Sequence, residues 1–261
     1  MQYPKSLIGI IGGSGFYEFF NMSNQTQINV ETPFGKVPVT IGDILGKRIA
    51  FLARHGKGHA LPPHKINYRA NALALFYLGV KYVIATNATG SLRKEIKPGS
   101  IVVPDQIIDF TKNRVYTFFD GTFELTFPGG RIKKGVIHTD VTEPYCKKLR
   151  EKIIQAAKQL NIELFEKGTY ICTEGPRFET PAEIRFFQLI GGDIVGMTGS
   201  PETFLFRELE VCYASISIVT NYAAGMQDRV SHEEVIDLFE KRREVIIKLI
   251  TKTIELLDET L

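Results

Sequence analysis

The sequence predicts an α/β fold in which helices pack against a mostly parallel sheet. Two observations lead to this prediction: short runs rich in Val and Ile recur along the 261 residues, and helical patterns alternate with them. Such runs with polar edges are typical of strands buried on both faces. Because no internal repeat, low-complexity tract or linker interrupts the alternation, we expect one domain over residues 1–261.

The individual elements follow in chain order from local signals. Strands are expected at 7–11, 48–53, 80–86, 100–109, 169–174, 193–197 and 213–220. Helices are expected at 67–79, 144–161, 180–191, 200–209 and 231–259. The helix start at Thr180 is well marked, because Pro181 and Glu183 occupy the first-turn and capping-box positions. Residues 111–135 have weaker periodicity and more turn residues, so we expect a long excursion near a site.

Composition excludes several classes of partner and compartment. Lys and Arg total 32 against 29 Asp and Glu, and no basic cluster interleaved with aromatics indicates nucleic acid. No apolar run approaches the roughly 18 residues of a membrane span. Glycines interrupt the apolar segment after Lys5, so we expect it to be the first strand and not a secretion signal. Cys146, Cys172 and Cys212 are far apart and odd in number. We therefore expect a protein of the reducing cytoplasm, with no disulfide framework and no metal.

Polar groups follow the predicted strands consistently. Ligands of open α/β sheets bind beyond the carboxyl ends of strands, so these groups are expected to converge. They are Gly12-Gly13-Ser14-Gly15, Arg54-His55-Gly56, Asn87-Ala88-Thr89-Gly90-Ser91, Thr198-Gly199-Ser200 and Asn221. Together they offer hydroxyls, a guanidinium, an imidazole and backbone N–H groups, which suit a small oxyanion. The glycine turn matches neither dinucleotide nor P-loop spacing; it could also be purely structural, and Arg54 a surface ion pair.

A second group of residues suits a flat heterocycle. Phe178 and Glu179 lie between a predicted strand and a helix cap, while Met197 and Asn221 end other strands. An aromatic ring and a thioether can sandwich a heterocycle, and a carboxylate and a carboxamide can bind its edge. The alternative is structural: Phe178 and Met197 in the core, Glu179 favouring the helix dipole and Asn221 capping a turn.

Several longer segments occur in one order between about residues 7 and 240. They are "GIIGGSGFY", "TPFG", "FLARHGKGHALPPHKINYRAN", "NATGSL", "TFFDG", "EGPRFET", "DIVGMTGSPE" and "TNY". In these segments the sequence resembles the purine nucleoside phosphorylase and methylthioadenosine phosphorylase family of the trimeric type. The resemblance implies one phosphorylase/hydrolase-like domain with a central mixed, mostly parallel sheet flanked by helices. It also implies a homotrimer or dimer of trimers that needs no cofactor and uses inorganic phosphate as co-substrate.

The resemblance assigns roles to particular residues. Ser14, Arg54, His55, Asn87, Thr198 and the backbone of Ala88 match the phosphate site. Phe178 and Met197 match positions beside the base and ribose; Glu179 and Asn221 match base-edge contacts, with Ala223 in the same segment. His138 matches a residue that some relatives extend into the neighbouring subunit's site. Arg54 and His55 would hold the phosphate that attacks C1′, while Asn221 stabilises the leaving purine at N7.

Three positions favour 6-oxopurine nucleosides. An ionised Glu179 accepts N1–H, and also the 2-amino group of guanine. The adenine-directed relatives have a serine there, and an Asp-x-Asp where this chain has Asn221-Tyr222-Ala223. His232 matches a histidine of 6-oxopurine phosphorylases that can bind a 5′-hydroxyl, whereas relatives that take methylthio sugars have an apolar residue there. His232 could alternatively be an exposed histidine in the first turn of the last helix.

The expected activity is therefore reversible phosphorolysis of inosine and guanosine to free base and ribose 1-phosphate in purine salvage. The alternatives are S-methyl-5′-thioinosine or S-methyl-5′-thioadenosine phosphorylase. Two further alternatives are a uridine phosphorylase and a nucleoside-binding protein that has lost turnover. The residues that suit a two-ring base argue against a uridine phosphorylase. The complete set of residues that match the phosphate site argues against a protein that has lost turnover.

Overall fold

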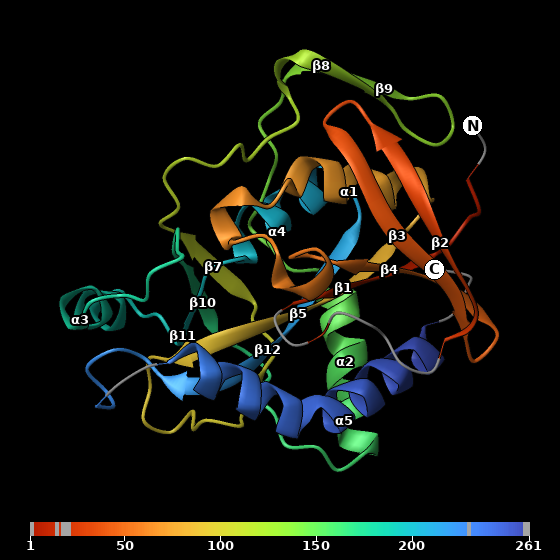
Figure 1. Ribbon diagram of the computed structural model, residues 1–261. Coiled ribbons are helices and arrows are strands. Elements are labelled where there is room, and N and C mark those ends of the chain that lie inside the picture. Colours follow the sequence, from red (N-terminus) through yellow and green to blue (C-terminus); the bar gives the residue numbers. More distant parts are fainter. Residues whose placement is uncertain (1–2, 14–15, 17–21, 229–230, 258–261) are drawn as a thin grey trace.

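The computed structural model describes residues 3–13, 16, 22–228 and 231–257, and these build a sheet of ten strands with helices on both faces (Figure 1). The sheet contains β1 (Ile8–Gly12), β2 (Ser23–Thr32), β3 (Gly35–Ile44), β4 (Lys47–Ala53), β5 (Tyr82–Ser91), β6 (Ile101–Val102), β7 (Gln106–Asp109), β10 (Thr169–Cys172), β11 (Ile194–Gly196) and β12 (Cys212–Tyr222). A separate hairpin joins β8 (Asp120–Thr126) and β9 (Ile132–Val136). The α-helices are α1 (Tyr68–Tyr77), α2 (Lys147–Gln159), α3 (Pro181–Leu189), α4 (Gly199–Glu208) and α5 (His232–Leu256).

The sheet is mixed and mostly parallel, as the sequence predicts. β1 pairs in parallel with β4 and β5, and β5 pairs in parallel with β12. β10 pairs in parallel with β7 and β11. The antiparallel pairs are β2–β3, β3–β4, β11–β5 and β12–β6. Because β1, β4, β5 and β12 run in one direction, their carboxyl ends share one edge of the sheet.

Two apolar layers hold the helices on the sheet. Figure 1 shows α1 and α4 on one face and α2 and α5 on the other. The first layer includes Leu73 and Phe206, and the second includes Ile153 and Ile250, all nearly inaccessible to solvent. None of the helices described is both long enough and apolar enough to cross a membrane.

Three features of the strands differ from the predictions. The single strand expected over 100–109 is two strands, because Pro104 has no N–H to donate to a ladder. β6 therefore pairs with β12 while β7 pairs with β10. The β2–β3 hairpin was not predicted, since β2 is mostly exposed and has no buried apolar run. The excursion over 111–135 includes strand β8 and the start of β9.

The expectation of no disulfide was wrong. Cys146 precedes α2 and Cys212 begins β12, and their sulfurs are bonded, with the Cα atoms 5.1 Å apart. The Cys146 N–H also donates to the Tyr213 carbonyl over 2.8 Å. The two cysteines are 66 residues apart, so only the packing of α2 beside β12 reveals the pair. Cys172 is a free thiol, and burial raises its pKa to about 12.

Candidate functional site

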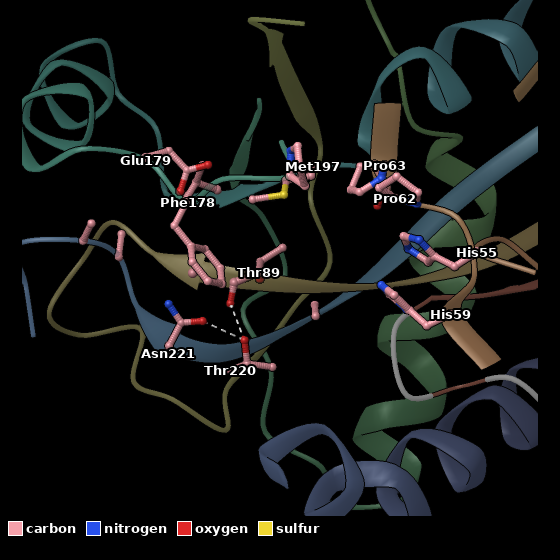
Figure 2. Close-up of a pocket in the computed structure, with 18 of the residues that line it drawn as sticks. His55, His59, Pro62, Pro63, Thr89, Phe178, Glu179, Met197, Thr220 and Asn221 are labelled. Atoms are coloured by element: carbon pink, nitrogen blue, oxygen red, sulfur yellow. Dashed lines mark hydrogen bonds between the residues drawn. The ribbon is translucent and has the colours of Figure 1, made fainter. Parts of the chain in front are cut away.

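A cavity of about 380 Å³ opens where β4, β5, β10, β11 and β12 end or the chain leaves them. This volume lies within the range of small-molecule sites. Nine of the residues predicted from the sequence line it: Arg54, His55, Ala88, Phe178, Glu179, Met197, Thr198, Asn221 and Ala223. Figure 2 shows two ends, with His55 and His59 at one and Phe178, Glu179 and Asn221 at the other.

Arg54 is the buried cation of the first end. Its Nε and Nη2 each donate to the Glu202 carboxylate over 2.7 Å, and its Nη1 donates to the Thr86 carbonyl over 2.8 Å. Burial disfavours the charged guanidinium, but the charge and hydrogen bonds of Glu202 outweigh it, so the pKa of Arg54 is raised. These bonds use three of the five N–H groups of the guanidinium. Two N–H groups remain for an anion in the cavity.

His55 and His59 stand together beside Arg54. The His55 Nδ1 lies 2.9 Å from the Leu61 carbonyl, which can only accept, so Nδ1 carries the proton. The two imidazole rings stack, with centroids 4.2 Å apart. His59 lines the cavity and was not predicted. Its position four residues after His55, within "RHGKGH", is the signal that could have identified it.

Asn87 lies behind Thr198 and does not line the cavity. Its Nδ2 donates to the Thr198 Oγ1 over 2.8 Å, and its Oδ1 accepts from the Ser215 Oγ over 2.5 Å. The Ser215 bond fixes the orientation of the amide. Because the Thr198 oxygen accepts from Asn87, its hydroxyl proton can be donated to a second partner. Asn87, predicted as a phosphate ligand, is therefore placed to orient the Thr198 hydroxyl and not to line the cavity.

The glycine turn after β1 lies against Arg54. A Cβ on Gly12 would lie 1.9 Å from the Phe16 carbonyl oxygen, and one on Gly13 would lie 2.9 Å from the Arg54 Nη1. The Gly13 N–H donates to the Thr86 Oγ1 over 3.0 Å. These glycines are required because the backbone approaches its neighbours too closely for a side chain. Ser14, predicted as a phosphate ligand, lies outside the described residues.

Glu179 supplies a carboxylate at the second end. Its Oε1 accepts a hydrogen bond of 2.6 Å from the Thr173 Oγ1. Burial raises the pKa of Glu179, and the Thr173 hydrogen bond opposes that rise. Phe178, the preceding residue, is 37% exposed and presents its ring to the cavity (Figure 2).

Asn221 presents a carboxamide at the same end of the cavity as Glu179. β12 bulges between Val219 and Asn221, and a bulge of this kind redirects the side chain that follows it. The Thr220 Oγ1 donates to the Asn221 Oδ1, and the Asn221 Nδ2 donates to the Tyr222 carbonyl, each over 2.8 Å. One N–H of the amide remains after these contacts. The cavity therefore combines an anion-binding end with an end that can bind the edge of a heterocycle.

A sequence model described as the phosphorylase superfamily matches residues 7–255. The chain belongs to this superfamily. A 6-oxopurine nucleoside phosphorylase from Pyrococcus furiosus is 53% identical over 251 residues, or 96% of this chain and 92% of the relative. A probable S-methyl-5′-thioinosine phosphorylase from Methanopyrus kandleri is 49% identical over 95% of this chain and 91% of the relative.

The likeness extends to solved structures. The methylthioadenosine phosphorylase of Schistosoma mansoni in complex with adenine superposes with a TM-score of 0.86. It is 35% identical, and the match covers 97% of this chain and 92% of that one. The family resemblance and the fold class predicted from the sequence are thereby confirmed.

Arg114 is a buried residue that supports the loops around the cavity of this phosphorylase, and sequence reasoning missed it. Its Nη1 donates to the carbonyls of Met197 and Ser200 over 2.8 and 2.6 Å, and its Nη2 donates to the Glu174 carbonyl over 2.6 Å. Arg114 thus ties the excursion over 111–135 to the loops after β10 and β11. No motif marks it, because its partners come from distant segments: backbone carbonyls, the Tyr68 hydroxyl and the Glu174 carboxylate.

Two other predicted residues of the phosphorylase are His138 and His232. His138 follows β9, is exposed, and does not line the cavity described here. The backbone of His232 begins α5, but its side chain lies outside the described residues.

Proposed function

We propose that this phosphorylase is a purine-nucleoside phosphorylase, a pentosyltransferase that acts on 6-oxopurine nucleosides. It converts inosine or guanosine and inorganic phosphate reversibly to free base and ribose 1-phosphate, as in purine salvage. The single observation that carries this proposal is the Glu179 carboxylate at the base end of the cavity. A carboxylate accepts the N1–H of hypoxanthine or guanine, whereas the N1 of adenine presents a second acceptor.

The phosphate end supports the first part of the reaction. Arg54, the Thr198 hydroxyl, His55 and the backbone of Ala88 surround the space in which a phosphate dianion would be held against the ribose. As the glycosidic bond breaks, positive charge develops on the ribose and the phosphate stabilises it. The phosphate oxygen then bonds to C1′ while the electron pair of the C1′–N9 bond leaves with the purine. The reaction uses no metal or organic cofactor.

Asn221 supports the departure of the base. Negative charge grows on the purine ring as the bond breaks, and the remaining amide N–H of Asn221 can donate to N7. An amide cannot transfer a proton as an acid does, so solvent or substrate must protonate the purine. Phe178 and Met197 supply apolar contacts to the base and ribose.

A second candidate, S-methyl-5′-thioinosine phosphorylase, is favoured by the 49% identical relative with that probable name. S-methyl-5′-thioadenosine phosphorylase is the remaining alternative, but its 6-aminopurine suits Glu179 less well. The two 6-oxopurine candidates share a base and differ at the 5′ position. We propose that His232 decides between them by binding a 5′-hydroxyl, since an imidazole left unpaired against a methylthio group costs about 1–3 kcal/mol.

The deciding experiment is a competition assay with inosine, guanosine, adenosine, methylthioadenosine and methylthioinosine. We expect phosphate-dependent release of hypoxanthine and guanine at the highest kcat/KM. Faster release of adenine from methylthioadenosine would disprove the base assignment, and binding without product would indicate a protein that has lost turnover. His232→Val should raise the turnover of methylthioinosine relative to inosine, and an unchanged ratio would remove His232 from the argument.

The assembly proposed is a homotrimer or dimer of trimers, in a cytoplasmic protein, with His138 reaching the site of a neighbouring subunit. The exposure of His138 and its absence from the cavity lining of its own chain support this proposal. Mixing inactive His138→Ala and Asn221→Ala chains tests it, because hybrid assemblies would contain some sites with both native residues. Recovery of activity is expected, whereas no recovery would contradict the shared site.

A further inference from the structure

The Glu179 carboxylate depends on one neighbouring hydroxyl. The Thr173 Oγ1 lies 2.6 Å from the Glu179 Oε1 and 3.4 Å from the Gly196 carbonyl oxygen. A hydroxyl has one proton, and the shorter contact is the stronger hydrogen bond. The Thr173 proton therefore points to Glu179, and this oxygen is held as an acceptor.

The charged groups around Glu179 offer it no alternative partner among the described residues. Arg177 donates to both oxygens of Glu183, over 2.7 and 2.9 Å, and is thereby held in an ion pair away from Glu179. Burial and the charge of Glu183 raise the pKa of Glu179, while the Thr173 hydrogen bond, a backbone hydrogen bond at Glu179 itself and, more weakly, the charge of Arg177 lower it. Loss of the Thr173 hydroxyl would leave a half-buried carboxylate with its largest stabilising side-chain contact removed.

Thr173 is itself held rigidly. It directly follows β10, and its N–H donates to the Gly196 carbonyl over 2.9 Å. The loop from Glu174 to Phe178 leaves the sheet at this point, and Glu179 brings the chain back to the Thr173 hydroxyl. The short hydrogen bond thus closes the loop that presents Phe178 and Glu179 to the cavity.

We propose that Thr173 is a specificity-determining positioning residue, whose hydroxyl holds the Glu179 carboxylate in the orientation and charge state that accept N1–H of a 6-oxopurine. This inference rests on the proposed function and extends it to a residue that does not itself line the cavity. A neutral Glu179 would present a hydroxyl that can donate to the N1 of adenine. Without Thr173, discrimination between the two classes of base should therefore weaken.

The test compares Thr173→Val, which removes only the hydroxyl, with Thr173→Ser, which retains it. Thr169→Val is a matched control at the other end of the same strand. We expect Thr173→Val to lower kcat/KM for inosine about tenfold, mainly through KM, and to affect adenosine less. The acid limb of the inosine pH profile should move to higher pH. Thr173→Ser should restore both, and Thr169→Val should change neither.

Calorimetric binding of hypoxanthine and adenine separates this inference from the proposed function. Thr173→Val should lose affinity for hypoxanthine and not for adenine, whether or not the wild type turns nucleosides over. Equal losses of affinity for the two bases would overturn the inference. So would a Thr173→Val variant whose pH profile and ratio of kcat/KM for inosine to that for adenosine match those of the wild type. A wild type that binds hypoxanthine but releases none from inosine would instead overturn the proposed function.

Discussion

Arg54 and Glu202 form a buried ion pair at the anion-binding end of the cavity, joined by two hydrogen bonds of 2.7 Å. Their side chains are 0% and 3% exposed. The Tyr213 hydroxyl donates to the same carboxylate over 2.7 Å. Glu202 thus keeps Arg54 charged and oriented while leaving part of the guanidinium for a phosphate. The pair therefore affects both the stability of the fold and the binding of an anion, because either charge buried without the other destabilises the protein.

Replacing Glu202→Gln should destabilise the fold by about 3–5 kcal/mol, because it leaves the Arg54 charge buried without its counter-ion. Urea unfolding followed by circular dichroism measures the change. Glu31→Gln is the control, since Glu31 pairs with Lys36 at the surface and both side chains are 56% exposed. That variant should lose less than about 1 kcal/mol. Similar losses in the two variants would contradict this account of the buried pair.

Asn87 and Thr198 should act as one unit in binding phosphate. Thr198→Val removes the hydroxyl, and Asn87→Ala removes the amide that orients it. Each change should raise the KM for phosphate about tenfold and alter the KM for nucleoside much less. The double variant should have a KM for phosphate little higher than that of either single variant, because both changes remove the same hydrogen-bonded arrangement of Asn87 and Thr198. If the two effects on the KM for phosphate multiplied in the double variant, steady-state kinetics would argue against the coupling.

The disulfide between Cys146 and Cys212 should stabilise the chain without affecting turnover. It closes a loop of 66 residues, for which the loop-entropy relation gives roughly 4 kcal/mol. Reductant should therefore lower the Tm of the wild type. It should not change the Tm of the Cys146→Ser/Cys212→Ser variant. Since Cys212 and Asn221 are at opposite ends of β12, kcat should be preserved, and a large fall in kcat would contradict this separation.

Glu183 should contribute pH-dependent stability at the start of α3. Hydrogen bonds from Arg177 and from the Thr180 N–H lower the pKa of Glu183 to about 2, from a usual 4.5. A carboxyl whose pKa is lowered by folding stabilises the fold above its unfolded pKa, and this stabilisation is lost as pH falls through the folded value. Glu183→Gln should therefore cost under about 1 kcal/mol at pH 7, because the pair is partly exposed.

Urea midpoints of the wild type and Glu183→Gln, taken at pH 7 and near pH 2, measure that difference. The gap between the two proteins should shrink at the acid end. A gap independent of pH would show that the charge of Glu183 plays no part. The substitution should leave Glu179 in place, so the inosine KM serves as the functional control.

Features that depend on residues close together in the chain were predictable from the sequence. Thr180 and Glu183 form both hydrogen bonds of the capping box, because a helix start depends on residues within one turn. The alternation of apolar runs with helical patterns indicated an α/β fold with a mostly parallel sheet, because it too can be recognised within short segments of the chain. Once the strands were placed, the convergence of Arg54 and Asn221 followed from the shared edge at which the parallel strands β4 and β12 end. Thr198 reaches the same cavity from β11, which runs antiparallel to β5, and only the tertiary structure shows this.

The sequence by itself therefore determined the fold class, the family and the chemical types of group at the cavity. Tertiary structure alone decided which groups are partners: Asn87 with Ser215, 128 residues apart, Arg54 with Glu202, 148 apart, and Cys146 with Cys212. It also moved Asn87 from the lining to the support of Thr198 and brought Arg114 to the loops around Met197. The physical reason is that these bonds depend on distance and orientation across packed elements, and no local spacing along the chain encodes them.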